Sequence, residues 1–206
     1  MDNTTLVPAM ALALASNFGN VEQWGASFVA LAAAHGAAGG ELRLELDPAS
    51  GTLVNRWSTG ATADDAIDTL MTVALPAASS DVLADLDWPR ACQRYQDAVH
   101  AASVPFAAHD IAGAHLIDVR RAGVFETATT MLPVAVWRDP AKPADWAHEL
   151  QDDRPVLVCC VYGHEVGRVA AMRLRALGVN ARFLVGGIDG WEHTGRAVVA
   201  KPAAPS

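Results

Sequence analysis

VLVCCVYGHEVGRVAAMRL (residues 156–174) joins a short apolar run to a helical pattern and places two adjacent cysteines near the junction. The run at 155–160 predicts a buried strand, because it is short and rich in valine and leucine. Apolar side chains recur at spacings of three and four over 165–177, which predicts a helix that Gly178 is suited to end. The loop between strand and helix would therefore bring Cys160 to the helix N-terminus.

Two roles for Cys160 are open on spacing alone. Backbone amides and the helix dipole favour an anion at a helix N-terminus, so we expect the thiol to have a lowered pKa and nucleophilic character. Gly163 would give the tight loop its backbone freedom. The alternative is a core residue, because free cysteines are among the most buried residue types. Cys159 should point to the opposite face of the strand and is the better candidate for burial.

Three further apolar runs alternate with helical stretches, at 115–120 (HLIDVR), 135–138 (AVWR) and 181–187 (ARFLVGG). Short runs of this kind predict an α/β domain with a mostly parallel central sheet flanked by helices. Ligands of such sheets bind beyond the carboxyl ends of the strands, which is where residue 160 lies. We place this domain at residues 103–200 and expect residues 201–206 to form a disordered tail.

Residues 1–102 predict a smaller, mainly helical α+β region that contains a β-hairpin. Strict alternation over 41–47 (ELRLELD), a PASG turn and a second run at 52–57 predict the hairpin. Helical spacing of apolar residues marks three segments, at 20–36, 64–73 and 88–102. Asp87 can cap the last of these, and Pro89 suits its first turn.

Charge and composition exclude several kinds of partner. The formal net charge is −8, with only 15 Lys and Arg residues, so no basic stripe is available for nucleic acid. The apolar stretch at 6–15 is too short to span a bilayer, and no basic residues precede it as in a signal peptide. The three cysteines form no disulfide framework. We therefore expect a cytoplasmic protein that binds neither nucleic acid nor membrane.

No cofactor or metal is expected either. The seven histidines show no metal-ligand spacing. The glycine-rich stretch at 186–190 (GGIDG) lacks the lysine and the spacing of a nucleotide-binding loop.

Three motifs, in this order and spacing, resemble the rhodanese (thiosulfate sulfurtransferase-like) domain. They are LIDVRR at 116–121, VLVCCVYGHEVGRVAAMRLRALGV at 156–179 and ARFLVGGIDGW at 181–191. In the family, a strand ends in Asp-Val-Arg, a Cys-x-x-Gly-x-Arg-Ser loop precedes a helix, and a Leu-x-Gly-Gly-x-x-x-Trp segment follows. The resemblance covers roughly residues 104–200 and implies a rhodanese-like fold.

The resemblance also implies sulfur transfer by Cys160. This residue would take the outer sulfur of thiosulfate or a related donor, hold it as a persulfide and pass it to cyanide or a thiol. A protein acceptor could dock on residues 1–102. Asp118 and Arg120 match the strand-end pair that supports neighbouring loops in the family, and Arg168 is a further supporting residue. The loop would cradle the sulfur anion through Val161, Tyr162, Gly163, His164, Glu165 and Val166.

The loop departs from the family pattern. Glu165 stands where many members carry Arg, and Val166 where they carry Ser; a carboxylate beside a thiolate would raise the pKa of the cysteine. Alternatively, the helix dipole favours Glu165 in the first turn, and Arg168 pairs with it. His164 could supply positive charge or a substrate hydrogen bond, or simply be solvated. The Cys-Val-x-Gly-His-Glu loop also resembles variant rhodaneses of bacterial chromate-resistance gene clusters.

Other family features are incomplete. The Gly-His-Ile-Pro-Gly-Ala stretch of the family is represented by TMLPVAVWR (130–138), which keeps Pro133 and Ala135 without the histidine. The opening strand and helix of the family are not evident before residue 116, and 88–102 is a candidate for that helix. Phosphatases of a related fold need Arg six residues after the nucleophile, where this chain has Val166, so phosphate hydrolysis is disfavoured.

Two hypotheses follow. The first is a working sulfurtransferase, and the second is a non-catalytic rhodanese-like module that binds a partner or senses an oxyanion. The substitution Cys160→Ala separates them, because it would abolish sulfur transfer and leave partner binding intact.

Overall fold

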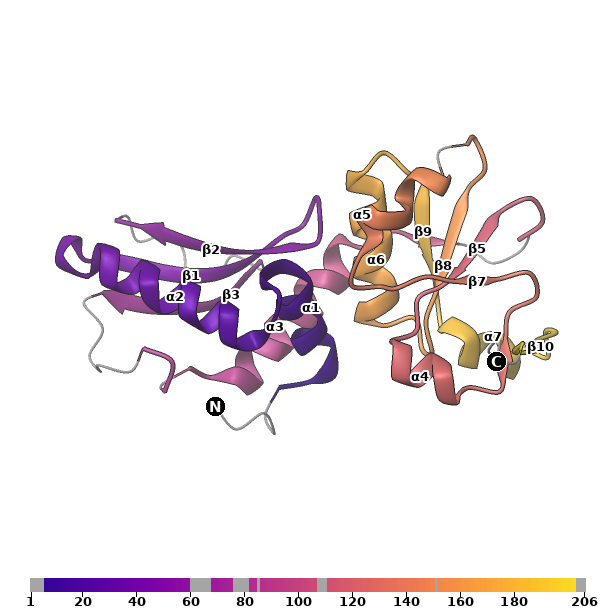
Figure 1. Cartoon of the computed structure of the whole chain (residues 1–206), viewed down its shortest axis with the longest axis horizontal. Coiled ribbons are helices and arrows are strands. Elements are labelled where there is room, and N and C mark those ends of the chain that lie inside the picture. Colours follow the sequence, from indigo (N-terminus) through magenta and orange to yellow (C-terminus); the bar gives the residue numbers. More distant parts are fainter. Residues whose placement is uncertain are drawn as a thin grey trace. The chain divides into compact units, whose positions relative to one another are not determined.

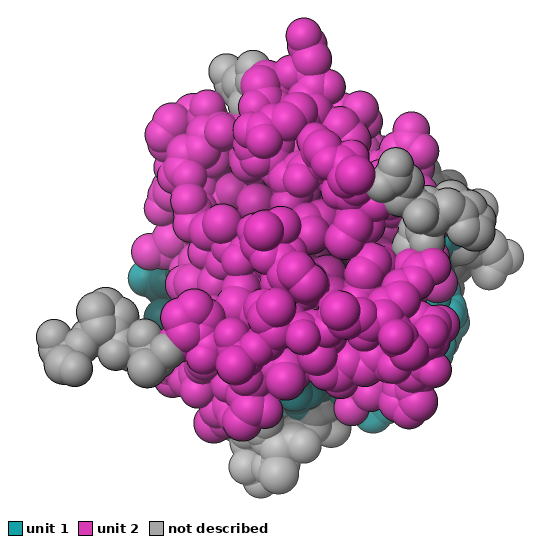
Figure 2. Space-filling view, turned by 90° about the vertical axis from the view of Figure 1, so that its right-hand side faces the viewer, with its two compact units in different colours: residues 1–101 teal, residues 102–206 magenta. Residues whose placement is uncertain are grey.

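The chain divides into two units between Ala101 and Ala102, as a computed structural model shows. Figure 2 colours residues 1–101 teal and residues 102–206 magenta. The structure describes residues 6–59, 68–75, 82–84, 86–106, 111–150 and 152–202. Within these ranges, no helix combines the length and the apolar character needed to cross a membrane.

The described residues of the first unit form a three-stranded antiparallel sheet and three helices (Figure 1). The helices are α1 (Pro8–Phe18), α2 (Val21–His35) and α3 (Trp88–Ala102), and a 3-10 turn, η1 (Gly36–Ala38), follows α2. The strands are β1 (Gly40–Asp47), β2 (Thr52–Ser58) and β3 (Thr69–Leu75), in the order β2-β1-β3. The α+β character and the hairpin expected from the sequence are both confirmed.

Local signals in the sequence set several boundaries of this unit. The Asn20 side chain accepts a hydrogen bond from the Gln23 N–H at 2.7 Å and so caps α2. Asp87 caps α3 in the same way, accepting from the Arg90 N–H at 3.0 Å. Both predicted helix starts are therefore confirmed.

The helix predicted at 64–73 is wrong over its described part. Residues 69–75 form β3, which pairs with β1 in antiparallel register, Leu44 opposite Met71. A short apolar run fits either period, and pairing with β1 decides in favour of the strand. Residues 64–67 lie outside the described residues. Helix α1 was not predicted from the sequence, although Met10, Ala13 and Leu14 bury one helical stripe there.

A five-stranded parallel sheet forms the centre of the second unit (Figure 1). Its strands are β4 (Pro105–Phe106), β5 (His115–Asp118), β7 (Val136–Trp137), β8 (Val156–Cys159) and β9 (Ala181–Leu184), in the order β4-β9-β8-β5-β7. Strands β6 (Thr130–Met131) and β10 (Val199–Ala200) form a separate antiparallel pair. The helices are α4 (Ala122–Thr127), α5 (Pro143–Trp146), η2 (Ala147–Leu150), α6 (Glu165–Ala176) and α7 (Gly187–His193).

Each face of this sheet buries its own apolar core. On one face, α5, η2 and α6 cover Val156, Val158 and Phe183. On the other face, α7 covers Leu157 and Leu184. The alternation along β8 sends successive side chains to opposite cores, as expected for a central strand. The predicted α/β domain with helices on both faces is confirmed.

Several details of the second unit differ from the expectations. Pro105–Phe106 supplies an opening strand that was not evident from the sequence, and residues 107–110 lie outside the described residues. On α6, the predicted stripe is buried at Val169, Ala170 and Leu174, whereas Leu177 is exposed. Lys201, which we assigned to a disordered tail, donates backbone and side-chain hydrogen bonds to residues 125–129.

Candidate active site

Cys160 lies directly after β8, at the carboxyl edge of the parallel sheet. Its side chain packs in the core cluster with Val156 and Val158, whereas Cys159 packs in the opposite cluster with Leu157. The prediction that the two cysteines point to opposite faces is confirmed. Both are buried, with exposed fractions of 6% for Cys160 and 1% for Cys159.

A five-residue loop, Cys160 to His164, turns the chain from β8 into α6. His164 occupies the N-cap position in an extended conformation, and Glu165 is the first residue of the helix. Gly163 has a φ of +68°, and a β-carbon there would lie 2.4 Å from the Leu184 carbonyl oxygen. Only glycine satisfies both conditions, so the expected need for backbone freedom at Gly163 is confirmed.

Backbone N–H groups converge on the Cys160 thiol. Hydrogen bonds from the N–H groups of Gly167, Gly163, His164 and Tyr162 all act to lower its pKa. Three of these residues belong to the predicted cradle, whereas Gly167 does not. A cluster of amides around one sulfur favours negative charge there, because hydrogen bonds to an anion stabilise the charged form.

The predicted net lowering of the Cys160 pKa is wrong. Burial is the largest influence on this group and raises its pKa from the usual value of 9.0, and the four N–H groups offset only part of that effect. The sequence indicates a helix N-terminus but not how completely the loop encloses the thiol. Cys160 is therefore mainly a thiol at neutral pH, within a cluster of donors that favours the anion.

The first residues of α7 hold the loop through hydrogen bonds to its backbone. The N–H groups of Ile188 and Asp189 donate to the carbonyl oxygens of Cys160 and Val161, both at 2.9 Å. Gly187 has a φ of +61°, and a β-carbon there would lie 2.4 Å from the Val161 carbonyl oxygen. The Cys160 and Val161 carbonyls thus point toward α7, and the N–H of the Val161–Tyr162 peptide points the other way, toward the sulfur.

The remaining cradle residues have different surroundings. Tyr162 is 55% exposed, and its ring centroid lies 5.8 Å from that of the exposed His164. Glu165 and Val166 are half-buried, and Val166 packs against the core that contains Cys160.

Arg168 of α6 reaches back to the loop. Its Nε donates to the Gly163 carbonyl at 2.9 Å, and one terminal nitrogen donates to the Ser103 hydroxyl at 2.7 Å. Burial lowers the pKa of this guanidinium, while the charges of Glu165 and of a Cys160 thiolate act in the opposite direction. The charges of Arg168 and Glu165 therefore influence each other, and the ion pair expected between them stays a prediction.

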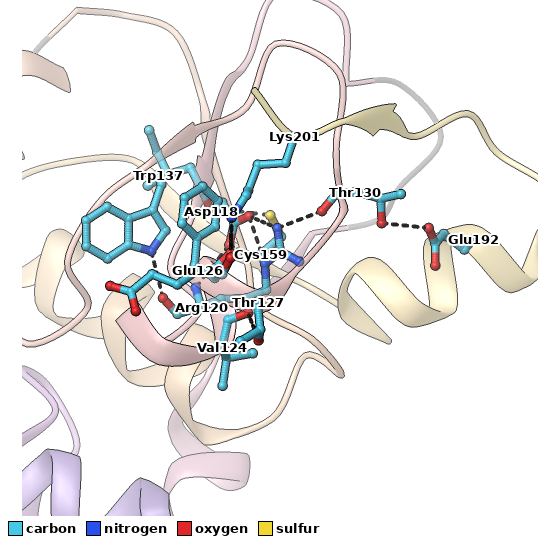
Figure 3. Close-up of polar contacts among 12 residues, drawn as sticks. Asp118, Arg120, Val124, Glu126, Thr127, Thr130, Trp137, Cys159, Glu192 and Lys201 are labelled. Carbon is cyan, nitrogen blue, oxygen red and sulfur yellow. Dashed lines mark hydrogen bonds and ion pairs between the residues drawn. The ribbon is translucent and has the colours of Figure 1, made fainter. Parts of the chain in front are cut away.

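Asp118 and Arg120 form a buried ion pair at the end of β5 (Figure 3). Arg120 donates two side-chain hydrogen bonds to one Asp118 oxygen, from Nε at 2.9 Å and from Nη2 at 2.6 Å. It also donates to the Thr130 carbonyl at 2.9 Å and so joins β5 to β6. The pair lies beside Cys159, whose pKa is raised first by burial and then by the Asp118 charge.

Aromatic and basic groups surround this ion pair (Figure 3). The Trp137 indole N–H donates to the Arg120 carbonyl at 2.7 Å. The Phe125 ring stacks on Trp137 with centroids 5.4 Å apart, and the Lys201 ammonium lies 4.6 Å from the Phe125 centroid. The Asp118–Arg120 pair therefore organises the loops next to the cysteine strand, and its hydrogen bonds run to those loops rather than to the Cys160 sulfur.

Gly167 is a site residue that the sequence did not single out. A β-carbon at this position would lie 3.1 Å from the Cys160 sulfur, and the Gly167 N–H acts directly on that thiol. A glycine within a helical pattern costs stability and usually has a packing reason, which is the signal that could have identified it.

Comparison with known proteins identifies the second unit. Residues 105–194 match the family model described as the Rhodanese-like domain. No curated protein matches the chain.

Among solved structures, a rhodanese-related protein from Thermoplasma volcanium is similar at 24% identity, covering 43% of this chain and 86% of that one, with a TM-score of 0.38. A possible tyrosine phosphatase of unknown function from Rhodopseudomonas palustris is 15% identical, covering 52% and 92%, with a TM-score of 0.45. Thiosulfate sulfurtransferase from Pseudomonas aeruginosa is 20% identical, covering 42% and 16%, with a TM-score of 0.37. The family match, rather than these likenesses, identifies the domain.

Proposed function

Residues 105–194 are a rhodanese-like domain, and we propose that the chain is a sulfurtransferase in which Cys160 carries the transferred sulfur as a persulfide. The donor is thiosulfate or a related sulfane-sulfur compound. The acceptor is a thiophilic group such as cyanide or a thiol.

The reaction takes place in two displacements. The Cys160 thiolate attacks the outer sulfur of thiosulfate, a new S–S bond forms, and the original S–S bond breaks with its electron pair leaving on sulfite. The acceptor then attacks the terminal sulfur of the persulfide, and the Cys160 thiolate departs. The first step exchanges one S–S bond for another, and the second exchanges the persulfide S–S bond for an S–C bond to cyanide or an S–S bond to a thiol. Neither step needs an external oxidant.

One observation carries this proposal: the N–H groups of Tyr162, Gly163, His164 and Gly167 converge on the Cys160 sulfur. A terminal persulfide sulfur is an anion, and preformed donors stabilise such a charge without reorganisation. An ordinary core cysteine has no reason to collect four backbone donors. Burial of Cys160 also keeps bulk water from competing with those donors.

The high pKa of the thiol sets a condition on the first step. Burial disfavours the resting thiolate, so the free enzyme holds little of the nucleophile at neutral pH. The persulfide is more acidic as a chemical class, and the amides that surround the Cys160 sulfur would lie near its charge. The site is thus better matched to the sulfur-loaded state than to the free thiolate, as expected of a carrier.

Mass measurement of the intact protein tests the function. After incubation with thiosulfate, the parent chain and Cys159→Ala should each gain the mass of one sulfur atom, which cyanide then removes. Cys160→Ala should gain none. A gain that persists in Cys160→Ala, or no gain in the parent with several donors, would overturn the proposal.

A second candidate function is a non-catalytic module that binds a partner or an oxyanion. Glu165 favours it, because a carboxylate at the first position of α6 opposes an anionic donor. Under this alternative, Cys160→Ala leaves binding unchanged. The first unit is then the candidate surface for a protein partner, and under sulfur transfer the same surface would serve a protein acceptor.

A reducing compartment such as the cytoplasm suits the proposed chemistry. The three cysteines, Cys92, Cys159 and Cys160, are unbridged. Such a compartment keeps the Cys160 thiol reduced between cycles and supplies thiol acceptors.

A further inference from the structure

One peptide group links Arg168 to the reactive sulfur. The Gly163 carbonyl and the His164 N–H belong to the same planar peptide, in which they point in opposite directions. Arg168 Nε donates to that carbonyl at 2.9 Å, and the His164 N–H acts on the Cys160 thiol. A side chain that fixes the carbonyl therefore also fixes the direction of the N–H.

The Arg168 guanidinium is itself held on other sides. It donates to the Ser103 hydroxyl at 2.7 Å, and its central carbon lies 4.1 Å from the centroid of the Phe183 ring. The Arg168 N–H also donates to the His164 carbonyl at 3.2 Å, which places the side chain at a fixed point of the first turn. A group with this many contacts can hold a loop peptide in one orientation.

The Val161–Tyr162 peptide of the loop is oriented in a similar way, by the main chain. The Asp189 N–H of α7 holds the Val161 carbonyl at 2.9 Å, and the N–H of that same peptide, on Tyr162, acts on Cys160. Two donors of the cradle are thus fixed through their carbonyl ends. Of these two, only the one held by Arg168 depends on a side chain that substitution can remove.

The positive charge of Arg168 interacts with the charges of both Glu165 and Cys160. Its pKa responds to the charges of both Glu165 and Cys160, so the guanidinium lies within electrostatic reach of each. It therefore opposes the unfavourable effect of the Glu165 carboxylate on an anionic sulfur. The titratable groups nearest to Cys160 along β8, its loop and the first turn of α6 are Cys159, Tyr162, His164, Glu165 and Arg168, and Asp189 lies in the first turn of α7. Farther along the same two helices are Arg173 and Arg175 of α6 and Glu192 and His193 of α7.

We propose that Arg168 is a positioning residue for the sulfur chemistry of Cys160: it holds the Gly163–His164 peptide so that the His164 N–H stabilises the anionic sulfur. This role deepens the proposed sulfur transfer and rests on it for its biological use. Its physical effect on the Cys160 thiolate is measurable without any transfer.

The test is the pH dependence of iodoacetamide alkylation at Cys160, followed by peptide mass, in the full chain. Arg168→Met should slow alkylation about tenfold at a fixed pH below the thiol pKa, which corresponds to a rise of about one pKa unit. Arg168→Lys keeps the charge but not the fork geometry, so it should restore only part of the rate. Ser103→Ala removes one support of the guanidinium and should slow alkylation about two- to threefold.

Arg182→Met is the matched control, because it removes one positive charge from an exposed position on β9. It should leave the alkylation profile unchanged. A rate for Arg168→Met within twofold of the parent, or full restoration by Arg168→Lys, would overturn the positioning role. If circular dichroism shows that Arg168→Met does not fold, the test rests on Arg168→Lys and Ser103→Ala. Alkylation of Cys160 at the parental rate in both variants would then overturn the positioning role.

The two proposals can fail separately. If the parent gains no sulfur from donors yet Arg168→Met raises the thiol pKa, positioning stands and sulfur transfer falls. If the parent gains sulfur and the alkylation profile of Arg168→Met matches the parent, transfer stands and the positioning role falls.

Discussion

The Gly187 α-carbon lies so close to the cysteine loop that a β-carbon on it would be 2.5 Å from the Cys160 carbonyl oxygen. The same β-carbon would be 2.6 Å from the Gly163 nitrogen, and both contacts involve backbone atoms, which cannot rotate away. The loop and the start of α7 therefore fit together only without a side chain at position 187.

Gly187→Ala should destabilise the second unit by about 3 kcal/mol or more, because it adds backbone overlap to the cost of a positive φ. Sulfur loading of Cys160 should fall with it. Gly195→Ala is the control: Gly195 has a φ of +74°, but a β-carbon there would have no neighbouring atom within 4 Å. It should cost only about 1–2 kcal/mol in urea unfolding. Equal losses in both variants would contradict the packing argument.

Breaking the Asp118–Arg120 pair should be strongly destabilising, because both side chains are buried. Arg120→Met leaves the Asp118 carboxylate buried without its cation and should cost about 3–5 kcal/mol. The double variant Asp118→Asn/Arg120→Met should lose less than Arg120→Met alone. The exposed pair of Arg154 and Asp152 is the control, and Arg154→Met should cost under about 1 kcal/mol. A double variant that sums the single losses would argue against coupling.

Val134 should be a site where substitution stabilises the protein. Its φ is +56°, in a turn closed by the Ala135 N–H donating to the Leu132 carbonyl at 3.2 Å, and 84% of the residue is exposed. A β-branched side chain is strained in this region, and asparagine tolerates it. Val134→Asn should raise the free energy of unfolding, measured in urea, by about 1 kcal/mol. The exposed Val185 has no such backbone, so Val185→Asn should bring no gain.

The rate of sulfur loading should rise with pH across the neutral range. Because burial raises the pKa of Cys160 above its usual value of 9.0, the thiolate fraction grows about tenfold per pH unit below that pKa. Stopped loading reactions at about pH 6.5 to 9.5, analysed by intact mass, would follow this increase. A rate that levels off below about pH 7 would mean that the amide donors outweigh burial.

Alkaline pH should weaken folding through the buried thiols. Burial raises the folded-state pKa of Cys92, Cys159 and Cys160 above 9.0, the value of an exposed cysteine. Above that pH the unfolded chain loses thiol protons that the folded chain retains, so stability present below pH 9.0 declines as pH rises. Urea unfolding under reducing conditions should show this decline. Cys92→Ala should make it shallower in the first unit, and an unchanged slope would contradict the assignment.

Much of the fold could be predicted because local signals and periodicity agreed. Asp87 and Pro89 predict the start of α3. The apolar run of β8 and the apolar stripe of α6 predict the strand and the helix on either side of the Cys160 loop. The error at β3 has a different origin: its apolar residues fit two periods, and only the partner strand β1 decides between them. Short strands such as β4 carry too few residues for any periodicity.

The residues around Cys160 could be predicted from the sequence, but the direction in which they shift its pKa could not. The spacing around Gly163 indicated a loop with inward amides, which the structure contains. The degree of burial of Cys160 depends on packing by distant parts of the sequence, such as Trp146 of α5, Phe183 of β9 and the start of α7, so the direction of its pKa shift could not be obtained locally. The contacts of Arg168 with Ser103 and Phe183 also join distant parts of the sequence, so they could not be predicted locally either.

The hydrogen bonds from Ile188 and Asp189 to the cysteine loop have a consequence for the order of events at the ribosome. A nascent chain that has emerged only as far as β9 already contains Cys160, but it lacks the α7 amides that hold the Cys160 and Val161 carbonyls. Since domains fold as their last segments become available, the thiol leaves the exit tunnel as an ordinary cysteine. The Cys160 and Val161 carbonyls gain their α7 partners only after residues 188 and 189 have emerged, so the loop reaches its final geometry only near the end of synthesis of the domain.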